Sequence, residues 1–188
     1  VNDITSYKNN IYAATDEGLL TADLDSPNLI DFNNWSLVAD PQVFEKKINT
    51  LTSNSTYLFV NVDEEDDRLL RFNGNLWEPY PFLDPFITRS LDTSGENLII
   101  CSQFNLNIFG PAGENIKGFY VGIPLKAGID RENNIWIADR LQGLIKNETG
   151  NEKVPVIPEG PANKFVWSIE IKDEKLVAVA GGTSSALN

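Results

Sequence analysis

The chain contains a unit of about 40 residues four times and begins it a fifth time. In every unit an apolar residue follows a polar turn, and we call it the downstream anchor. The downstream anchors recur at steps of 47, 40, 37 and 41 residues and are Ile11, Leu58, Leu98, Ile135 and Leu176. An upstream anchor precedes each by 7, 7, 7, 6 and 7 positions, and these residues are Ile4, Leu51, Leu91, Ile129 and Ile169. The near-constant offset within units indicates a structural repeat.

Each unit has the composition of four short β-strands. The anchors mark the first two, and turn-forming residues rich in Asn, Ser, Gly and Glu separate them. β-Branched and aromatic residues, which favour strands, form the second segments at 11–14, 57–60, 98–101, 135–138 and 176–179. Third segments follow at 18–20, 68–72, 106–109 and 143–146, and weaker fourth segments around 35–38, 77–78, 118–120 and 154–157. Four strands per unit of this length predict an all-β fold of β-propeller blades.

We expect a single partial β-propeller domain over residues 1–188. Its four complete four-stranded blades span about 1–46, 47–86, 87–125 and 126–164, and 165–188 forms half of a fifth. The missing strands of the fifth unit, and the start at Val1 without Met, favour a piece of a longer protein. An open series of blades exposes apolar faces at both ends, so we expect self-association through the terminal blades.

The composition excludes several classes of function. The chain is 41% hydrophobic and 22% charged, as in globular proteins, and its apolar runs of about five residues are too short to cross a bilayer. Its net charge of −12 repels phosphate backbones, so no nucleic-acid partner is expected. Cys101 lies in a predicted strand, where a buried and unreactive thiol is expected.

No catalytic constellation is recognisable. Histidine is absent, which removes histidine bases, triads and metal ligands, and we expect no enzyme, no cofactor and no metal site. The acidic run Asp63-Glu64-Glu65-Asp66-Asp67 has oxygen ligands for Ca²⁺ but lacks the spacing of a calcium loop. A solvated hairpin tip is the favoured interpretation, and a cation site is the alternative.

Other polar and aromatic residues have structural interpretations. The segment Asp130–Trp136 is similar to the aspartate box of sialidase-type propellers, but it lacks the glycine and its tryptophan comes one residue late. Such a box is structural, and two suitably spaced carboxylates for glycoside hydrolysis are not evident. The four tryptophans favour packing between blades over ligand stacking, and they are Trp35, Trp77, Trp136 and Trp167. Glycosylation sequons at Asn34, Asn54 and Asn147 carry no weight in an Asn-rich chain.

The fourth unit carries a family resemblance. Its segments Ala127–Asp139 and Gly143–Lys146 combine an Ile-Asp pair, a turn, an Ile-Trp-Ile strand and a Gly-Leu pair. This pattern resembles the two-component regulator propeller repeat, and residues 10–15 with 18–20 are a softer copy. Two features are more similar to the PorZ-like surface components of the type IX secretion system than to sensor propellers. They are the residues Ala138-Asp139 at the end of that strand and the segment 180–185.

That resemblance implies a cell-surface scaffold in Bacteroidota. The chain would then be part of a seven-bladed N-terminal propeller, exported to the outer-membrane surface or the periplasm. Its partners would be other proteins of a surface complex, with lipopolysaccharide bound through regions outside this chain. The alternative is the oligosaccharide-sensing propeller of a hybrid two-component histidine kinase. Neither interpretation identifies a contact face or binding residues.

Overall fold

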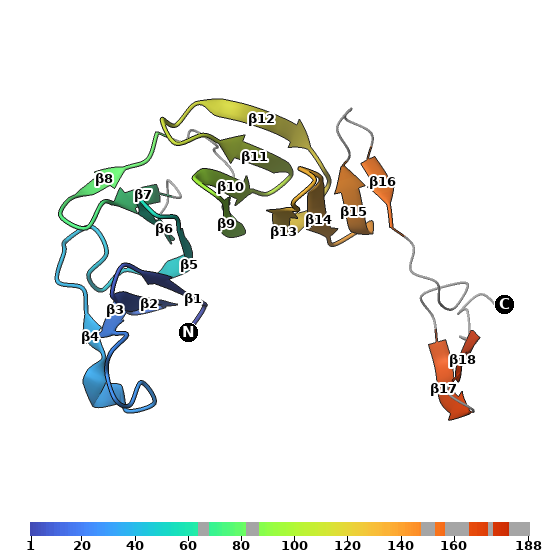
Figure 1. Ribbon diagram of the computed structural model, residues 1–188, viewed down its shortest axis with the longest axis horizontal. Helices are drawn as coiled ribbons and strands as arrows, with labels where there is room; N and C mark the ends of the chain where they lie inside the picture. Colours follow the sequence, from blue (N-terminus) through green and yellow to red (C-terminus); the bar gives the residue numbers. More distant parts are fainter. Residues whose placement is uncertain (64–67, 82–86, 148–152, 157–165, 173–174, 181–188) are drawn as a thin grey trace, which may run out of the picture. The chain divides into compact units, whose positions relative to one another are not determined.

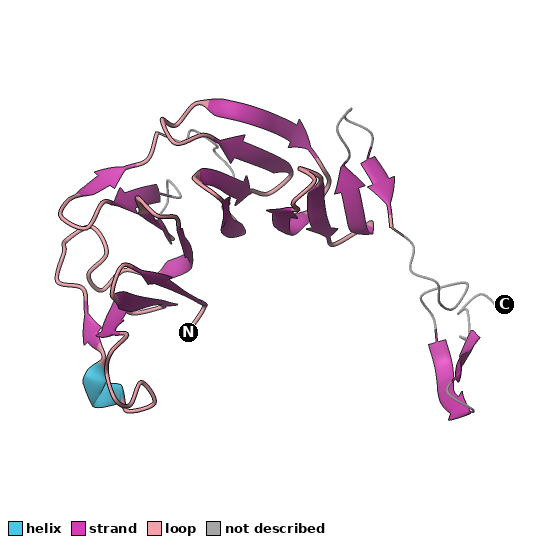
Figure 2. Ribbon diagram, in the orientation of Figure 1, coloured by secondary structure: helices cyan, strands magenta, loops and turns pink. Residues whose placement is uncertain are grey.

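The computed structural model describes residues 1–63, 68–81, 87–147, 153–156, 166–172 and 175–180. The chain divides into two compact units, Val1–Pro155 and Val156–Asn188, and each is described by itself. The first unit contains four antiparallel sheets of four strands, and the second contains a two-stranded sheet (Figure 1). Apart from a short 3-10 helix, η1 (Phe32–Asn34), the regular structure of the described residues consists of strands (Figure 2).

Within each sheet every strand pairs with the next strand in the chain. The first sheet comprises β1 (Asp3–Tyr7), β2 (Asn10–Thr15), β3 (Gly18–Asp23) and β4 (Ser36–Leu37). The second comprises β5 (Ile48–Ser53), β6 (Leu58–Val62), β7 (Arg68–Phe72) and β8 (Trp77–Pro79). The third comprises β9 (Ser90–Ser94), β10 (Asn97–Cys101), β11 (Asn105–Phe109) and β12 (Asn115–Tyr120). The fourth comprises β13 (Pro124–Ile129), β14 (Ile135–Asp139), β15 (Gly143–Asn147) and β16 (Lys153–Pro155), and the second unit has β17 (Val166–Lys172) and β18 (Lys175–Ala180).

The anchors identified in the sequence occupy matching strands. All five downstream anchors lie in the second strand of their sheet, and all five upstream anchors lie in the first. The predicted third and fourth strands of the four complete units are also present. The predicted all-β architecture of four complete units and a two-stranded fifth is therefore confirmed.

One anchor is out of register. Leu51 pairs with Val60, two residues beyond its downstream anchor, and the first, third and fifth units follow the same rule. In the fourth unit Ile129 pairs with the downstream anchor Ile135 itself, and Ala127 occupies the position equivalent to Leu51. The assignment of Ile129 as an equivalent anchor was wrong, because the turn at 130–134 is one residue longer than the corresponding turn of the second sheet.

Hydrophobic clusters fill the spaces between successive sheets of the first unit. The residues of β6 alternate between two of them: Leu58 and Val60 pack toward the first sheet, and Phe59 packs toward the third. The third cluster lies between the third and fourth sheets, with Ile99 and Ile137 among its members. Sheets that pack face to face in chain order are the arrangement of propeller blades.

The first strands of successive sheets are in contact, β1 with β5, β5 with β9 and β9 with β13, and Figure 1 shows them on the inner side of the four sheets. In two of these contacts a side-chain hydroxyl of the later strand donates a hydrogen bond to a backbone carbonyl of the earlier strand. Ser53 Oγ donates to the Ser6 carbonyl at 2.6 Å, and Thr93 Oγ1 donates to the Ser53 carbonyl at 2.9 Å. Ser6, Ser53 and Thr93 each pair with a downstream anchor, so the same repeat position forms both links.

A second series of links uses the residue immediately before the upstream anchor. The carboxylate atom Asp3 Oδ2 accepts from the Thr50 hydroxyl at 2.7 Å and from the Leu51 amide at 3.1 Å. The Thr50 hydroxyl in turn accepts from the Leu91 amide at 3.3 Å. These bonds satisfy polar groups at the inner edge and fix the sheets against each other.

Candidate functional site

The acidic run lies mostly outside the described residues, which exclude positions 64–67. Its first member, Asp63, accepts a hydrogen bond from Lys47 Nζ at 2.6 Å, and this bond raises the pKa of the Lys47 ammonium group. In the described part of the chain no cluster of three or more His, Cys, Asp or Glu side chains has an arrangement that could hold a metal ion. The choice between a hairpin tip and a cation site for this run stays a prediction.

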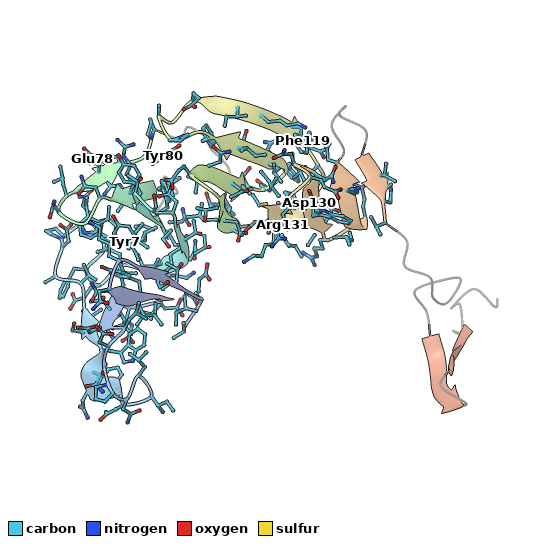
Figure 3. The ribbon with its side chains drawn as sticks, in the orientation of Figure 1. Tyr7, Glu78, Tyr80, Phe119, Asp130 and Arg131 are labelled. Atoms are coloured by element: carbon cyan, nitrogen blue, oxygen red, sulfur yellow. The ribbon has the colours of Figure 1, made fainter. Side chains whose placement is uncertain are left out.

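Asp130 organises the turn between β13 and β14. Its carboxylate accepts from the Glu132 and Asn134 amides at 2.9 Å each, and from Trp136 Nε1 at 2.8 Å. The bond from Trp136, followed by the bonds from Asn134, lowers the pKa of Asp130 to about 2. Figure 3 shows Asp130 at the fourth sheet. Every bond stays within this turn and its adjoining strand, so the segment similar to an aspartate box has a structural role.

The tryptophans occupy different environments. Trp77 is buried in the cluster between the first and second sheets, and its ring stacks on Phe72 at 4.7 Å between centroids. Trp136 is half-buried, with Lys146 Nζ 5.5 Å from the centre of its ring. Trp35 is also half-buried and follows η1, where its Nε1 donates to the Leu29 carbonyl at 2.9 Å. The predicted packing between blades holds for Trp77, and the side chain of Trp167 lies outside the described residues.

Cys101 and two of the sequon residues are structural. Cys101 is buried, and burial raises the pKa of its thiol to about 11, so the predicted unreactive thiol agrees with its environment. Asn54 Nδ2 donates to the Glu96 carbonyl at 3.0 Å. Asn147 is buried and accepts from Lys117 Nζ at 3.2 Å. Asn34 is exposed beside η1, where its side-chain amide donates to the Asn28 carbonyl at 2.6 Å.

A small pocket of about 150 Å³ lies between the second and third sheets. Its polar side chains come from the β5–β6 turn, β7, the residue after β8, and the β9–β10 turn. Its lining residues are Asn54, Thr56, Tyr57, Phe59, Arg71, Tyr80, Glu96, Leu98, Gly110 and Pro111. We call this site the inter-sheet pocket, and it is the candidate binding site.

Arg71 supplies the positive charge of the inter-sheet pocket. Its Nε donates to Glu78 Oε2 at 3.1 Å, which fixes the plane of the guanidinium group. The guanidinium carbon lies 4.9 Å from the centre of the Tyr57 ring and 6.0 Å from that of Tyr80. An arginine held by a carboxylate and two aromatic rings presents its remaining N–H groups in a fixed direction.

Tyr80 supplies a buried hydroxyl group that has no partner among the described residues. The residue is 6% exposed, and its hydroxyl forms no hydrogen bond with the described residues. Its ring is held by edge contacts with Phe59 at 5.6 Å and Phe109 at 5.9 Å. Burial raises the pKa of this phenol, and Arg71 opposes the rise, so the hydroxyl keeps its proton and can donate it in a hydrogen bond. Figure 3 shows Tyr80 and Glu78 at the second sheet.

Sequence reasoning did not find the inter-sheet pocket. Arg71 and Tyr80 lie on the third strand and after the fourth, where the repeat is weakest, and the other wall comes from the next sheet. The sequence did contain a pattern that could have revealed the hydrogen bonds between first strands. Ser6, Ser53 and Thr93 each lie two residues after an upstream anchor.

No protein-family model matches the chain, and no curated protein matches it. Several solved structures do. PorZ of Porphyromonas gingivalis, described as an essential bacterial surface component of the type IX secretion system, aligns with a TM-score of 0.65 at 18% identity. YCF48 bound to D1 peptide aligns with a TM-score of 0.54 at 13% identity, and U3-55K with 0.62 at 10%.

These alignments cover all or most of this chain but only part of each solved structure. The PorZ alignment covers 100% of this chain but 25% of PorZ. The other two cover 81% of this chain and 54% and 50% of YCF48 and U3-55K. At these identities the similarity identifies the fold, and together with the blade packing it confirms a β-propeller. No described helix is both long and apolar enough to span a membrane.

Proposed function

We propose that this chain is a non-catalytic interaction propeller and forms part of a cell-surface scaffold in a type IX secretion attachment complex. The similarity to PorZ over 100% of the chain is the observation that carries the proposal. The repeat pattern of the fourth unit, Ile135-Trp136-Ile137-Ala138-Asp139, supports the same choice.

The last residue of that pattern, Asp139, is buried, and its carboxylate holds the loop that follows β14. Asp139 accepts from the amides of Ile123, Leu141 and Gln142 at 2.7, 2.9 and 2.9 Å. It therefore ties the β14–β15 loop to the segment before β13, and rigid loops of this kind suit a scaffold that presents a surface to partners.

The proposal is tested in the organism that encodes the chain. The parent protein, tagged and cross-linked in living cells, is purified from the surface fraction, and its partners are identified by mass spectrometry. Other components of the secretion complex are the expected partners, and deletion of the gene is expected to block surface attachment of exported cargo. Recovery of the protein with a kinase module in the inner membrane, and unchanged cargo attachment, would contradict the proposal.

Oligosaccharide binding distinguishes the scaffold from the sensor alternative. Calorimetric titration of the purified chain with a panel of oligosaccharides is expected to give no heat beyond dilution. Tight and selective binding of one oligosaccharide would favour a sensor propeller and overturn the scaffold.

A further inference from the structure

The inter-sheet pocket has hydrogen-bond donors without acceptors. The buried Tyr80 hydroxyl is unpartnered among the described residues, and only the Nε of Arg71 has a carboxylate partner there. The Glu96 carboxylate also lines the pocket, and each of its oxygens accepts one hydrogen bond and keeps a lone pair for a further donor. Glu96 Oε1 accepts from the Ser55 hydroxyl at 2.6 Å, and Oε2 accepts from the Thr56 hydroxyl at 3.2 Å. A buried donor favours an acceptor, so the pocket is suited to a group that brings a carbonyl oxygen.

The charges around the inter-sheet pocket favour a neutral group. Arg71 is already paired with Glu78, and Glu96 lines the same pocket. Glu114 is close enough to act electrostatically on the Tyr80 phenol. A carboxylate would meet this negative surplus on a chain of net charge −12. An ammonium group has only donors and offers no acceptor to the Tyr80 hydroxyl. An amide supplies an acceptor without a negative charge.

The size and walls of the pocket favour the amide of a protein side chain over the amide of an acetylated sugar. A cavity of about 150 Å³ has room for a group the size of a benzene ring, so the pocket suits one side chain and not a longer segment of a partner. Phe59, Leu98 and Pro111 supply apolar walls for the carbons that precede the amide. Arg71 lies over the Tyr57 ring, so that face is unavailable for stacking a sugar.

We infer that the inter-sheet pocket binds the side-chain amide of a glutamine or asparagine in a partner polypeptide. Tyr80 and Arg71 donate to the amide oxygen, and the apolar walls hold the methylene groups. The inference rests on the proposed function, because it supplies a contact point for a protein partner. It assigns a binding site and a ligand chemistry to residues that the repeat pattern does not single out.

The test is a titration of the ¹⁵N-labelled 188-residue chain with N-acetyl-glutamine-N-methylamide, followed by NMR. Saturable shifts of the Arg71 Nε–H and Gly110 amide signals are expected, with a dissociation constant in the millimolar range for one side chain. The corresponding glutamate compound is expected to bind at least about tenfold more weakly because of its charge. Absence of saturable shifts, equal binding of the glutamate compound, or preferential binding of N-acetylglucosamine would each overturn the inference.

Tyr80→Phe is the decisive variant, because it removes the unpartnered hydroxyl and keeps the ring. Its affinity for the glutamine compound is expected to fall about tenfold, the effect of one lost hydrogen bond, without loss of thermal stability. Tyr120→Phe is the matched control, since Tyr120 is exposed on β12 and does not line the pocket. Unchanged affinity in Tyr80→Phe would overturn the inference.

The two proposals fail separately. If the parent protein enters the surface complex but the titration shows no binding, the pocket assignment is wrong and the scaffold proposal stands. If the pocket binds the glutamine compound but the protein enters no surface complex, the scaffold proposal is wrong.

Discussion

The second and fourth sheets have the same strand order but different environments. The second lies between two other sheets, and every residue of its strand β6 is buried. In β14, the equivalent strand of the fourth sheet, Ile135 and Ile137 are buried, whereas Trp136 is half-buried and Ala138 exposed. Leu69 on β7 and Leu144 on β15 occupy the same repeat position, yet Leu69 is 3% exposed and Leu144 is 42% exposed.

The difference shows that the neighbouring sheet decides burial. In a repeat protein each unit gains stability from its own folding and from its interfaces with adjacent units. The second sheet has two such interfaces within the first unit, and each contains a hydrophobic cluster. Among the described residues of the first unit, the fourth sheet has one such cluster, on the side of the third sheet, and the Asp130 turn adds hydrogen bonds between its first two strands.

The largest effect is expected from truncating the matched leucines. Leu69→Ala should lower the free energy of unfolding by about 2–5 kcal/mol, because it creates a cavity between the second and third sheets. Leu144→Ala should lower it by less than about 1 kcal/mol, because this side chain is partly exposed. Urea denaturation of both variants measures the difference. Equal losses would contradict the contrast between the two sheets.

A smaller effect is expected at the inner edge. Thr50→Val keeps the shape of a buried side chain but removes the hydroxyl that joins Asp3 to the Leu91 amide. The free energy of unfolding should fall by about 1–3 kcal/mol, because buried polar groups lose their partners. Thr50→Ser, which retains the hydroxyl, should lose less. A valine variant as stable as the wild type would show that these links do not hold the sheets together.

Removing the hydroxyl group should change stability differently at the two buried tyrosines Tyr7 and Tyr80. Tyr7 donates its hydroxyl to the Thr56 carbonyl at 2.7 Å, so Tyr7→Phe should lose about 1 kcal/mol of stability. Tyr80→Phe should be neutral or stabilising, because its hydroxyl has no partner among the described residues. Thermal unfolding of the two variants compares them directly. A loss in Tyr80→Phe as large as that in Tyr7→Phe would show that the Tyr80 hydroxyl is satisfied.

The smallest effect is local to the fourth sheet and depends on pH. The pKa of Asp130 is about 2, below its ordinary value of 3.8, so the turn is favoured above about pH 4 and loses this contribution as the pH falls toward 2. The indole N–H signal of Trp136 should shift in NMR spectra with a midpoint near pH 2. A midpoint near 4 would show that the bond does not stabilise the carboxylate. Asp130→Asn should abolish the titration.

The sequence was sufficient to predict the strands and their order, because apolar residues recur at a nearly constant offset on both strands of each hairpin. It misplaced Ile129, because the longer turn after it shifts the register without changing the apolar pattern. Packing that depends on neighbouring sheets was harder to predict, as the half-buried Trp136 shows. The inter-sheet pocket was missed for the same reason: Arg71 and Glu96 are 25 positions apart and meet only after two sheets pack.

The hydroxyl links between first strands have an evolutionary consequence. In both, the acceptor is a main-chain carbonyl, of Ser6 in one case and of Ser53 in the other. Every amino acid supplies that oxygen, so a blade duplicated, deleted or exchanged by recombination needs no compensating substitution in its predecessor to receive the bond. A serine or threonine at one place in the incoming blade is enough, which makes the number of blades easy to change while the way they join stays the same.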